Sequence, residues 1–261
     1  MLRVGLIGCG AIGSILAEAI DSGKAGDARL AAVFDASEKN VRTLLRRLKK
    51  RCAVAHSLGE LLSADTDVIV EAASQEAVRE YGEKVLQSGK DMVVLSVGAL
   101  LDRKFLSRML NAAEMGGARI HVPTGAVLAV DALKAASMGR IISVELTTIK
   151  PPRALGIKVA RRTVVFDGAA EEAVKRFPQN INVAATLSLA GIGERRTRVR
   201  IIADPKAKRN IHEIKVKAVS GCFQARIENV PSPQNPKTSY IAALSAVRLL
   251  KDMSERLRIG T

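Results

Sequence analysis

The chain has 261 residues, enough for one large domain or two modest ones with a real hydrophobic core. Its net charge of +15 favours anionic ligands, but only 3% of residues are aromatic and none is Trp, which argues against a platform for stacking nucleic-acid bases. Three isolated cysteines exclude a disulfide framework, and no segment approaches the roughly 20 apolar residues of a membrane span, so we expect a cytoplasmic protein without a metal site.

The first 123 residues alternate short apolar strands with amphipathic helices. Strands are predicted at residues 2–8, 28–35, 52–55, 67–73, 91–97 and 118–123. Helices are predicted at residues 11–23, 38–51, 58–64, 76–89 and 102–117. Ser57 followed by Glu60 predicts a capping box at the third of these helices. Such alternation with short connections is typical of an α/β fold with an open, doubly wound parallel sheet.

The pattern changes after Pro123. Helices are predicted at residues 131–139, 180–191 and 238–257. Strands are predicted at residues 141–150, 197–204, 211–219 and 222–230, with a loop at 231–237. Apolar and polar residues alternate in these strands, which predicts a second, α+β domain with a mostly antiparallel open sheet and one covered face.

A glycine loop joins the first predicted strand to the first predicted helix. In G-x-G-x-x-G, the first glycine permits a tight turn, the second lets a pyrophosphate approach the backbone, and the third lets helix and strand pack closely. Gly8, Gly10 and Gly13 occupy these places, with Ala11 and Ile12 between the last two. The loop predicts a dinucleotide-binding site, although glycine loops also serve as plain turns.

An acidic residue follows at the spacing that a dinucleotide site requires. Asp35 ends the second predicted strand, 22 positions after Gly13, where a carboxylate accepts hydrogen bonds from the ribose 2′-hydroxyl and repels a 2′-phosphate. We therefore expect NAD to be preferred, with Lys39 and Arg42 close enough to let NADP be accepted as well. The alternative is an ordinary capping Asp at the end of a strand.

These patterns define two domains. Residues 1–122 and 236–261 are predicted to form a discontinuous NAD(P)-binding Rossmann domain, because the final helix returns after a proline-rich loop. Residues 123–235 are predicted to form a substrate-binding and dimerisation domain. Its open sheet has an exposed face, which a homodimer would cover.

An enzyme that uses a nicotinamide also needs an acid/base group, and the chain has three histidines. His56 is expected in an exposed loop. His121 is expected to be structural, with lining of the site as the alternative. His212 opens a predicted strand beside Asn210, in basic surroundings. Position alone leaves both a catalytic and a structural reading of His212 open.

Segments along nearly the whole chain resemble the L-aspartate dehydrogenases. They are "VGLIGCGAIG", "DVIVEAASQEAVREYGEKVLQSGKDMVVLSVGALLD", "HVPTGAVLAVDALKAA", "FPQNINVAATLSLAG", "NIHEI" and "PSPQNPKTSYIAALSAVRLL". The chain departs from the family pattern at Thr124, where Ser is expected before "GA".

The resemblance implies oxidation of L-aspartate with NAD(P)⁺ to iminoaspartate. That product would be hydrolysed to oxaloacetate and ammonia, or feed quinolinate and pyridine nucleotide biosynthesis. The family's catalytic histidine falls on His212. The expected cofactor contacts beyond the glycine loop and Asp35 are Ala72, Ala73, Ser96, Ala126 and Asn182. The residues expected to bind the substrate are Asn210, Thr124 and Lys237.

Two alternatives share this architecture. One is a related Rossmann oxidoreductase, similar to dihydrodipicolinate reductase or homoserine dehydrogenase, although the chain lacks the paired histidines expected in the first of these. The other is a nucleic-acid-binding redox sensor, suggested by the net charge and the basic stretch at residues 42–51. Neither a helix-turn-helix nor a basic arm is visible to support the second.

Overall fold

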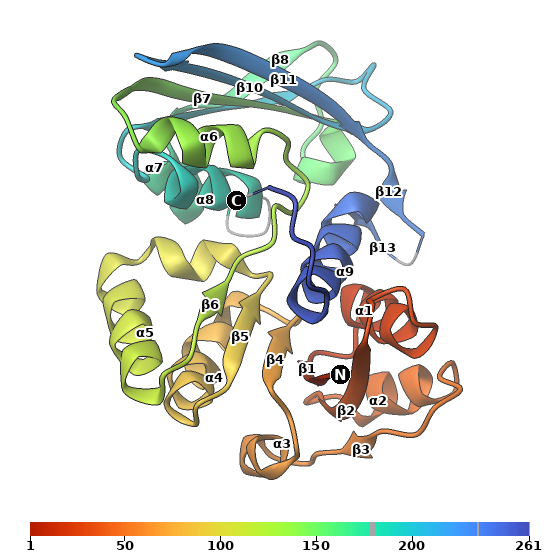
Figure 1. The fold of residues 1–261 in the computed structure, drawn as a ribbon. Helices are drawn as coiled ribbons and strands as arrows, with labels where there is room; N and C mark the ends of the chain where they lie inside the picture. The colour runs from red at the N-terminus through yellow and green to blue at the C-terminus, as the bar shows by residue number, and fades with distance from the viewer. Residues whose placement is uncertain (178–180, 234, 261) are drawn as a thin grey trace. The chain divides into compact units, whose positions relative to one another are not determined.

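A computed structural model describes residues 1–177, 181–233 and 235–260, with the backbone alone at 235–237. The chain divides into two compact units, each built on its own sheet (Figure 1). The first unit is Met1–Pro123 with Ala243–Arg258, and the second is Thr124–Ala242 with Ile259–Thr261. No helix in the described ranges is both long and apolar enough to span a membrane.

The first unit contains a six-stranded parallel sheet in the order β3-β2-β1-β4-β5-β6. Its strands are β1 (Leu2–Ile7), β2 (Ala28–Phe34), β3 (Ala53–Val54), β4 (Val68–Glu71), β5 (Asp91–Val94) and β6 (Ile120–His121). This confirms the predicted doubly wound sheet. The strand order reverses between β1 and β4, and ligands of such sheets bind beyond the carboxyl ends of the strands at this switch point.

Helices cover both faces of this sheet. They are α1 (Ala11–Asp21), α2 (Glu38–Leu45), α3 (Leu58–Ser63), α4 (Gln75–Gln87), α5 (Arg103–Gly116) and most of α9 (Tyr240–Ser254), with a 3₁₀ turn η1 (Val97–Leu101) after β5. On one side, Ala246 and Leu250 of α9 share a core with Leu16 of α1. On the other side, Phe105 and Met109 of α5 pack into the core that also contains α4.

Side-chain caps explain where helices of this unit begin, and a tertiary contact explains why one predicted helix is shorter in the structure. Ser57 Oγ accepts the Glu60 N–H at 3.2 Å, which forms one half of the predicted capping box. The Glu60 carboxylate accepts the N–H of His56, one residue before the N-cap. The helix predicted over residues 38–51 is wrong at its end, because α2 stops at Leu45. The Asp21 carboxylate accepts the N–H groups of Lys49 and Lys50, which ties this basic segment to the end of α1 instead of extending α2.

The second unit contains a five-stranded sheet in the order β11-β10-β7-β9-β8. Its strands are β7 (Ile141–Lys150), β8 (Thr163–Ala169), β9 (Thr197–Ala203), β10 (Asn210–Ala218) and β11 (Gly221–Asn229). Three of the four pairs are antiparallel, as expected, but β7 and β9 run parallel. The sheet is therefore mixed. The parallel pair is possible because the chain between β7 and β9 is long enough for a crossover connection, which carries two helices.

Three helices cover one face of this second sheet: α6 (Val130–Ser137), α7 (Ala170–Arg176) and α8 (Asn182–Ala190). Sequence patterns did not predict α7 or β8. A 3₁₀ turn η2 (Pro152–Leu155) follows the prolines after β7. The loop predicted at 231–237 is instead part of a short hairpin of β12 (Pro231–Ser232) and β13 (Asn235–Ser239).

Candidate functional site

The glycine loop holds β1 and α1 at distances that side chains would not allow. Gly8 has φ +97°, and a Cβ added there would lie 2.7 Å from the carbonyl oxygen of Ala72. A Cβ on Gly13 would lie 1.9 Å from the carbonyl oxygen of Gly8. Gly10 differs, because an added Cβ there would meet no heavy atom within 4 Å. The first and third glycines are thus required by packing, whereas the second lies beside open space.

The open space at Gly10 lies at the N-terminus of α1, an eleven-residue helix. Ala11 and Ile12 form its first turn, which contains no acidic side chain. The N–H groups of a helix's first turn and its macrodipole both favour a negative group at this end. The residues present therefore fit the pyrophosphate of a dinucleotide.

Asp35 follows β2 directly and lies against the glycine loop. Its Oδ2 accepts the Cys9 N–H at 2.7 Å, and its Oδ1 accepts the Ser37 N–H at 2.7 Å. Asn40 Nδ2 is a third donor, 3.3 Å from Oδ2 and 3.5 Å from Oδ1. A carboxylate has about four acceptor positions, so these donors orient Asp35 and leave it capacity to accept a hydroxyl. The side chain is half-buried, which is compatible with a ligand on its open side.

Ala72, Ala73 and Ser96 follow β4 and β5 and are held by a residue that sequence reasoning missed. Glu71 is 0% exposed, and its carboxylate accepts the Ala73 N–H at 2.8 Å. It also accepts the N–H and Oγ–H of Ser96 at 2.9 and 2.8 Å. One buried carboxylate thus ties both loops together. The available signal was a carboxylate ending the apolar strand "VIVE".

In the second unit, one end of the helix-covered sheet face is polar. We call these residues the polar cluster: Thr148, Lys150, Asn210, His212 and Asn229, with exposures of 4, 6, 7, 3 and 3%. The register pairs His212 with Thr148 and Asn210 with Asn229, and alternate residues of a strand share a face. Neighbouring positions on this face, such as Leu146 and Ile214, belong to the apolar core, so five buried polar side chains together at one end mark a candidate site.

His212 is a neutral base in this cluster. Its Nδ1 lies 3.0 Å from Thr148 Oγ1. Burial, aided by the positive charge of Lys150, lowers the pKa of His212 to about 3. Burial also lowers the pKa of Lys150 to about 8, so its ammonium is still largely protonated at neutral pH. The cluster therefore presents an uncharged imidazole, able to accept a proton, next to a cation.

The structure does not bring all the predicted second-unit residues into this cluster. Ala126 is connected to it, because Asn229 Nδ2 donates to the Ala126 carbonyl oxygen at 3.2 Å. Thr124, two residues earlier, is exposed, and Asn182 is exposed at the start of α8. Lys237 lies in β13, and its side chain is outside the described part of the chain.

The polar cluster contains two predicted site residues, Asn210 and His212. Its other members, Thr148, Lys150 and Asn229, were not predicted. The only signal for the first two was the pair of polar residues at alternate positions near the end of "VELTTIK". Within the described ranges, the buried Oδ1 of Asn229 has no hydrogen-bond partner.

The other histidines have local contacts. His121 Nε2 lies 2.9 Å from Asp91 Oδ2 and links β6 to β5. His56 is exposed, and its N–H donates to the carboxylate of Glu60 at 2.8 Å. Among the side chains that the structure describes, no group of three or more His, Cys, Asp and Glu residues is placed to hold a metal ion.

Known proteins match both units. The family model described as "Homoserine dehydrogenase, NAD binding domain" matches residues 8–123, and "Aspartate dehydrogenase, C-terminal" matches residues 131–253. The L-aspartate dehydrogenase of Methanosarcina barkeri is 46% identical over 273 residues, which cover 100% of both chains. That of Methanothermobacter thermautotrophicus is 44% identical over 261 residues, which cover 100% of this chain and 99% of the relative. The crystal structure of aspartate dehydrogenase from Thermotoga maritima superposes with a TM-score of 0.79 at 29% identity, with 100% of each chain covered.

Proposed function

The chain belongs to the L-aspartate dehydrogenase family, and on this basis we propose that it oxidises L-aspartate to iminoaspartate with a nicotinamide dinucleotide. The observation that carries the proposal is the buried, neutral imidazole of His212 beside the ammonium of Lys150. A base and a cation side by side suit a substrate that must lose a proton from its ammonium group and that carries two carboxylates.

The chemistry assigns a task to His212. Hydride leaves Cα of aspartate only when the nitrogen lone pair is free to form C=N, so the ammonium must first lose a proton. In the tautomer in which Nδ1–H donates to Thr148 Oγ1, Nε2 carries the free lone pair, and we assign Nε2 to accept that proton. A bound nicotinamide supplies the hydride acceptor. Once His212 has released that proton to solvent, the neutral imidazole can accept a second proton from a water that attacks the imine, giving oxaloacetate and ammonia. Release of the imine toward quinolinate and pyridine nucleotide biosynthesis is the other fate.

The cofactor proposal rests mainly on the first unit. Gly8, Gly10, Ala11, Ile12 and Gly13 would hold the pyrophosphate. Asp35 would accept the ribose hydroxyl, which favours NAD, with NADP accepted less well. The exposed Arg42 pairs with Glu38, which reduces its availability for a 2′-phosphate.

Further contacts to the cofactor are proposed from the loops after β4 and β5 and from the second unit. These residues are Ala72, Ala73, Ser96, Ala126 and Asn182. Asn210, Thr124 and Lys237 stay proposals for binding the substrate. Of these three, Asn210 has the strongest support, because it lies on the same strand face as His212.

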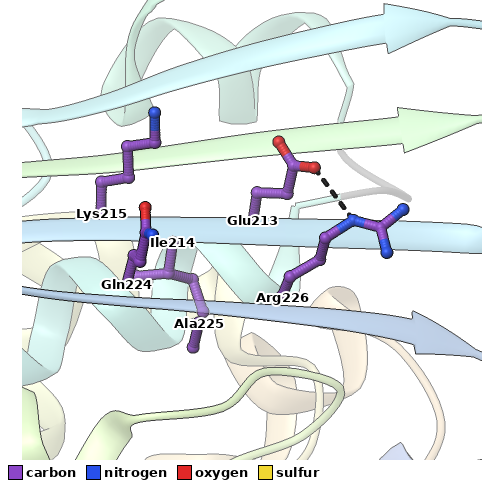
Figure 2. Close-up of a pocket in the computed structure, with 6 residues that line it drawn as sticks. All are labelled: Glu213, Ile214, Lys215, Gln224, Ala225 and Arg226. Carbon is purple, nitrogen blue, oxygen red and sulfur yellow. Dashed lines mark hydrogen bonds and ion pairs between the residues drawn. The ribbon is translucent and has the colours of Figure 1, made fainter.

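We also propose a homodimer formed through the open face of the second sheet. Acidic and basic side chains are mixed on this face: Asp167, Glu145, Glu213, Glu228, Arg198, Arg200, Lys215, Lys217 and Arg226. Figure 2 shows Glu213 and Lys215 of β10 with Arg226 of β11, along a shallow groove. A face of mixed sign can complement a copy of itself across a twofold axis. The unpaired cysteines suit a reducing, cytoplasmic location.

A spectrophotometric assay with L-aspartate, L-homoserine, NAD⁺ and NADP⁺ tests the central proposal. We expect reduced cofactor to form with aspartate and not with homoserine, and kcat/KM to be higher for NAD⁺. A folded protein that reduces neither cofactor in the presence of aspartate would contradict the proposed function.

A further inference from the structure

Lys150 is a buried ammonium group in the second unit. It ends β7, is 6% exposed, and lies two residues beyond Thr148 on the same strand face. The register that places Ile149 opposite Ile211 brings Lys150 level with Asn210, diagonally across from His212. Diagonal neighbours on paired strands are separated by about 7–8 Å. The charge of Lys150 contributes to the lowered pKa of His212, which agrees with this proximity.

A lysine in this position has a physical cost. Removing an ammonium from water is expensive, and placing it near a histidine lowers the proton affinity of that histidine as well. The four other members of the polar cluster are neutral, and a neutral residue at position 150 would cost less to bury. A buried charge beside a base is therefore a candidate for a functional group.

Two lysines of β10, the strand next to β7, do not share the buried environment of Lys150. Lys215 and Lys217 lie on β10 at positions that alternate with His212, so they are on the open face and are exposed to solvent. Lys150 is thus distinguished from them by burial and by sharing a face with the proposed base. Lys134, which is exposed on α6 and lies outside the proposed dimer face, serves as the control.

We propose that Lys150 binds one of the two carboxylates of the substrate beside His212. This inference rests on the proposed function and adds to it a substrate-binding residue. It also links binding to chemistry. Burial is the main cause of the lowered pKa of His212, and the positive charge of Lys150 adds to it. A carboxylate bound to Lys150 offsets that second contribution, so the imidazole becomes a better base when substrate is bound.

Equilibrium binding tests the proposal without turnover. Calorimetric titration of L-aspartate into the enzyme saturated with NADH measures a dead-end complex. We expect Lys150→Met to raise the Kd of aspartate at least about 30-fold, as loss of one partner from a buried charge pair does. The Kd of NADH for Lys150→Met stays within about twofold of the wild-type value, and Lys134→Met binds aspartate like the wild type. Unchanged aspartate binding by folded Lys150→Met overturns the proposal.

A ligand series compares affinities within one variant, so a general loss of affinity in that variant does not affect the test. β-Alanine lacks the α-carboxylate, and L-asparagine replaces the β-carboxylate by an amide. In the wild type, both bind more weakly than aspartate. In Lys150→Met, or in Lys150→Gln as a second neutral variant, one of these two differences disappears and identifies the carboxylate that Lys150 binds. If both differences keep their wild-type size, the proposal is wrong.

The outcomes separate this inference from the proposed function. If aspartate binding depends on Lys150 as expected but the wild-type enzyme reduces no cofactor, the proposed carboxylate site is supported and the proposed dehydrogenase activity is refuted. An enzyme that oxidises aspartate equally well with Met at position 150 refutes the carboxylate site alone. Succinate has the two carboxylates of aspartate but no amino group. If the wild-type protein binds neither aspartate nor succinate, the proposed carboxylate site is wrong.

Discussion

Nδ1 of His212 lies 3.0 Å from Oγ1 of Thr148, directly across the pair formed by β10 and β7. The contact orients the ring of a histidine that is 3% exposed. Because burial lowers the pKa of this histidine to about 3, its imidazole is neutral at physiological pH and can serve as a base.

The first prediction concerns turnover. His212→Ala removes the proposed proton acceptor, so we expect kcat for aspartate oxidation to fall by about 10²–10⁴-fold. NADH binding, measured by fluorescence titration, stays within about twofold. His56→Ala, at an exposed position of the first unit, is the control and keeps wild-type kcat. Wild-type turnover by His212→Ala would remove this residue from the mechanism.

The same histidine makes stability depend on pH. An unfolded histidine binds a proton below about pH 6.5, whereas folded His212 binds one only near its pKa of about 3. The unfolded state therefore gains protons first, and the contribution of this site to stability is lost as pH falls from about 6.5 toward 3. Between pH 7.5 and 5, wild-type unfolding free energy should fall by about 2 kcal/mol more than that of His212→Gln. Urea unfolding of both proteins checks this, and parallel pH dependences would contradict it.

Cofactor choice depends on Asp35. Asp35→Ser removes the carboxylate that would repel a 2′-phosphate, so the ratio of kcat/KM for NAD⁺ to that for NADP⁺ should fall at least about tenfold. It also removes the acceptor of the Cys9 N–H, so we expect the KM for both cofactors to rise. Asp27→Ser, an exposed carboxylate just before β2, controls for net charge. An unchanged ratio would exclude Asp35 as the ribose-binding acid.

Glu71 is predicted to position the loops after β4 and β5. Glu71→Gln places an amide NH₂ among N–H groups that need acceptors, which should destabilise the fold by about 1–3 kcal/mol. The Kd of NADH should rise while the KM for aspartate at saturating NAD⁺ stays near the wild-type value. Glu114→Gln, on the exposed side of α5, is the control. A stable Glu71→Gln variant with wild-type NADH affinity would show that the hydrogen bonds of the Glu71 carboxylate are not needed to position these loops.

The proposed dimer can be tested at Arg226, which pairs with Glu213 and Glu228 on the open face. Arg226→Glu places three carboxylates together and should shift the protein toward the monomer at micromolar concentration, as measured by multi-angle light scattering. Arg46→Glu, an exposed basic residue of the first unit, should leave the mass unchanged. A monomeric mass for the wild type would refute the dimer.

Much of the first unit could be predicted from the sequence, because its signals are local. Short apolar runs alternate with helical periodicity, and side-chain caps such as Ser57 mark helix starts. The glycine spacing specifies a turn that only residues without Cβ can make at Gly8 and Gly13. The errors arose where distant contacts compete with local preference. Asp21 takes the N–H groups of Lys49 and Lys50, and so the predicted extension of α2 does not form.

The sequence by itself determined which residues of a strand share a face, since side chains alternate with a period of two. It also determined the glycine loop, since Gly8 and Gly13 are close in the sequence and their spacing specifies the turn. Only the tertiary structure decided which strands are neighbours. Thr148 and His212 are 64 positions apart, and neither periodicity nor spacing relates them. Pairing of β7 with β10 in one register places a hydroxyl, an ammonium group and an imidazole at one buried sheet end, because the packing of whole strands, and not local propensity, selects that register.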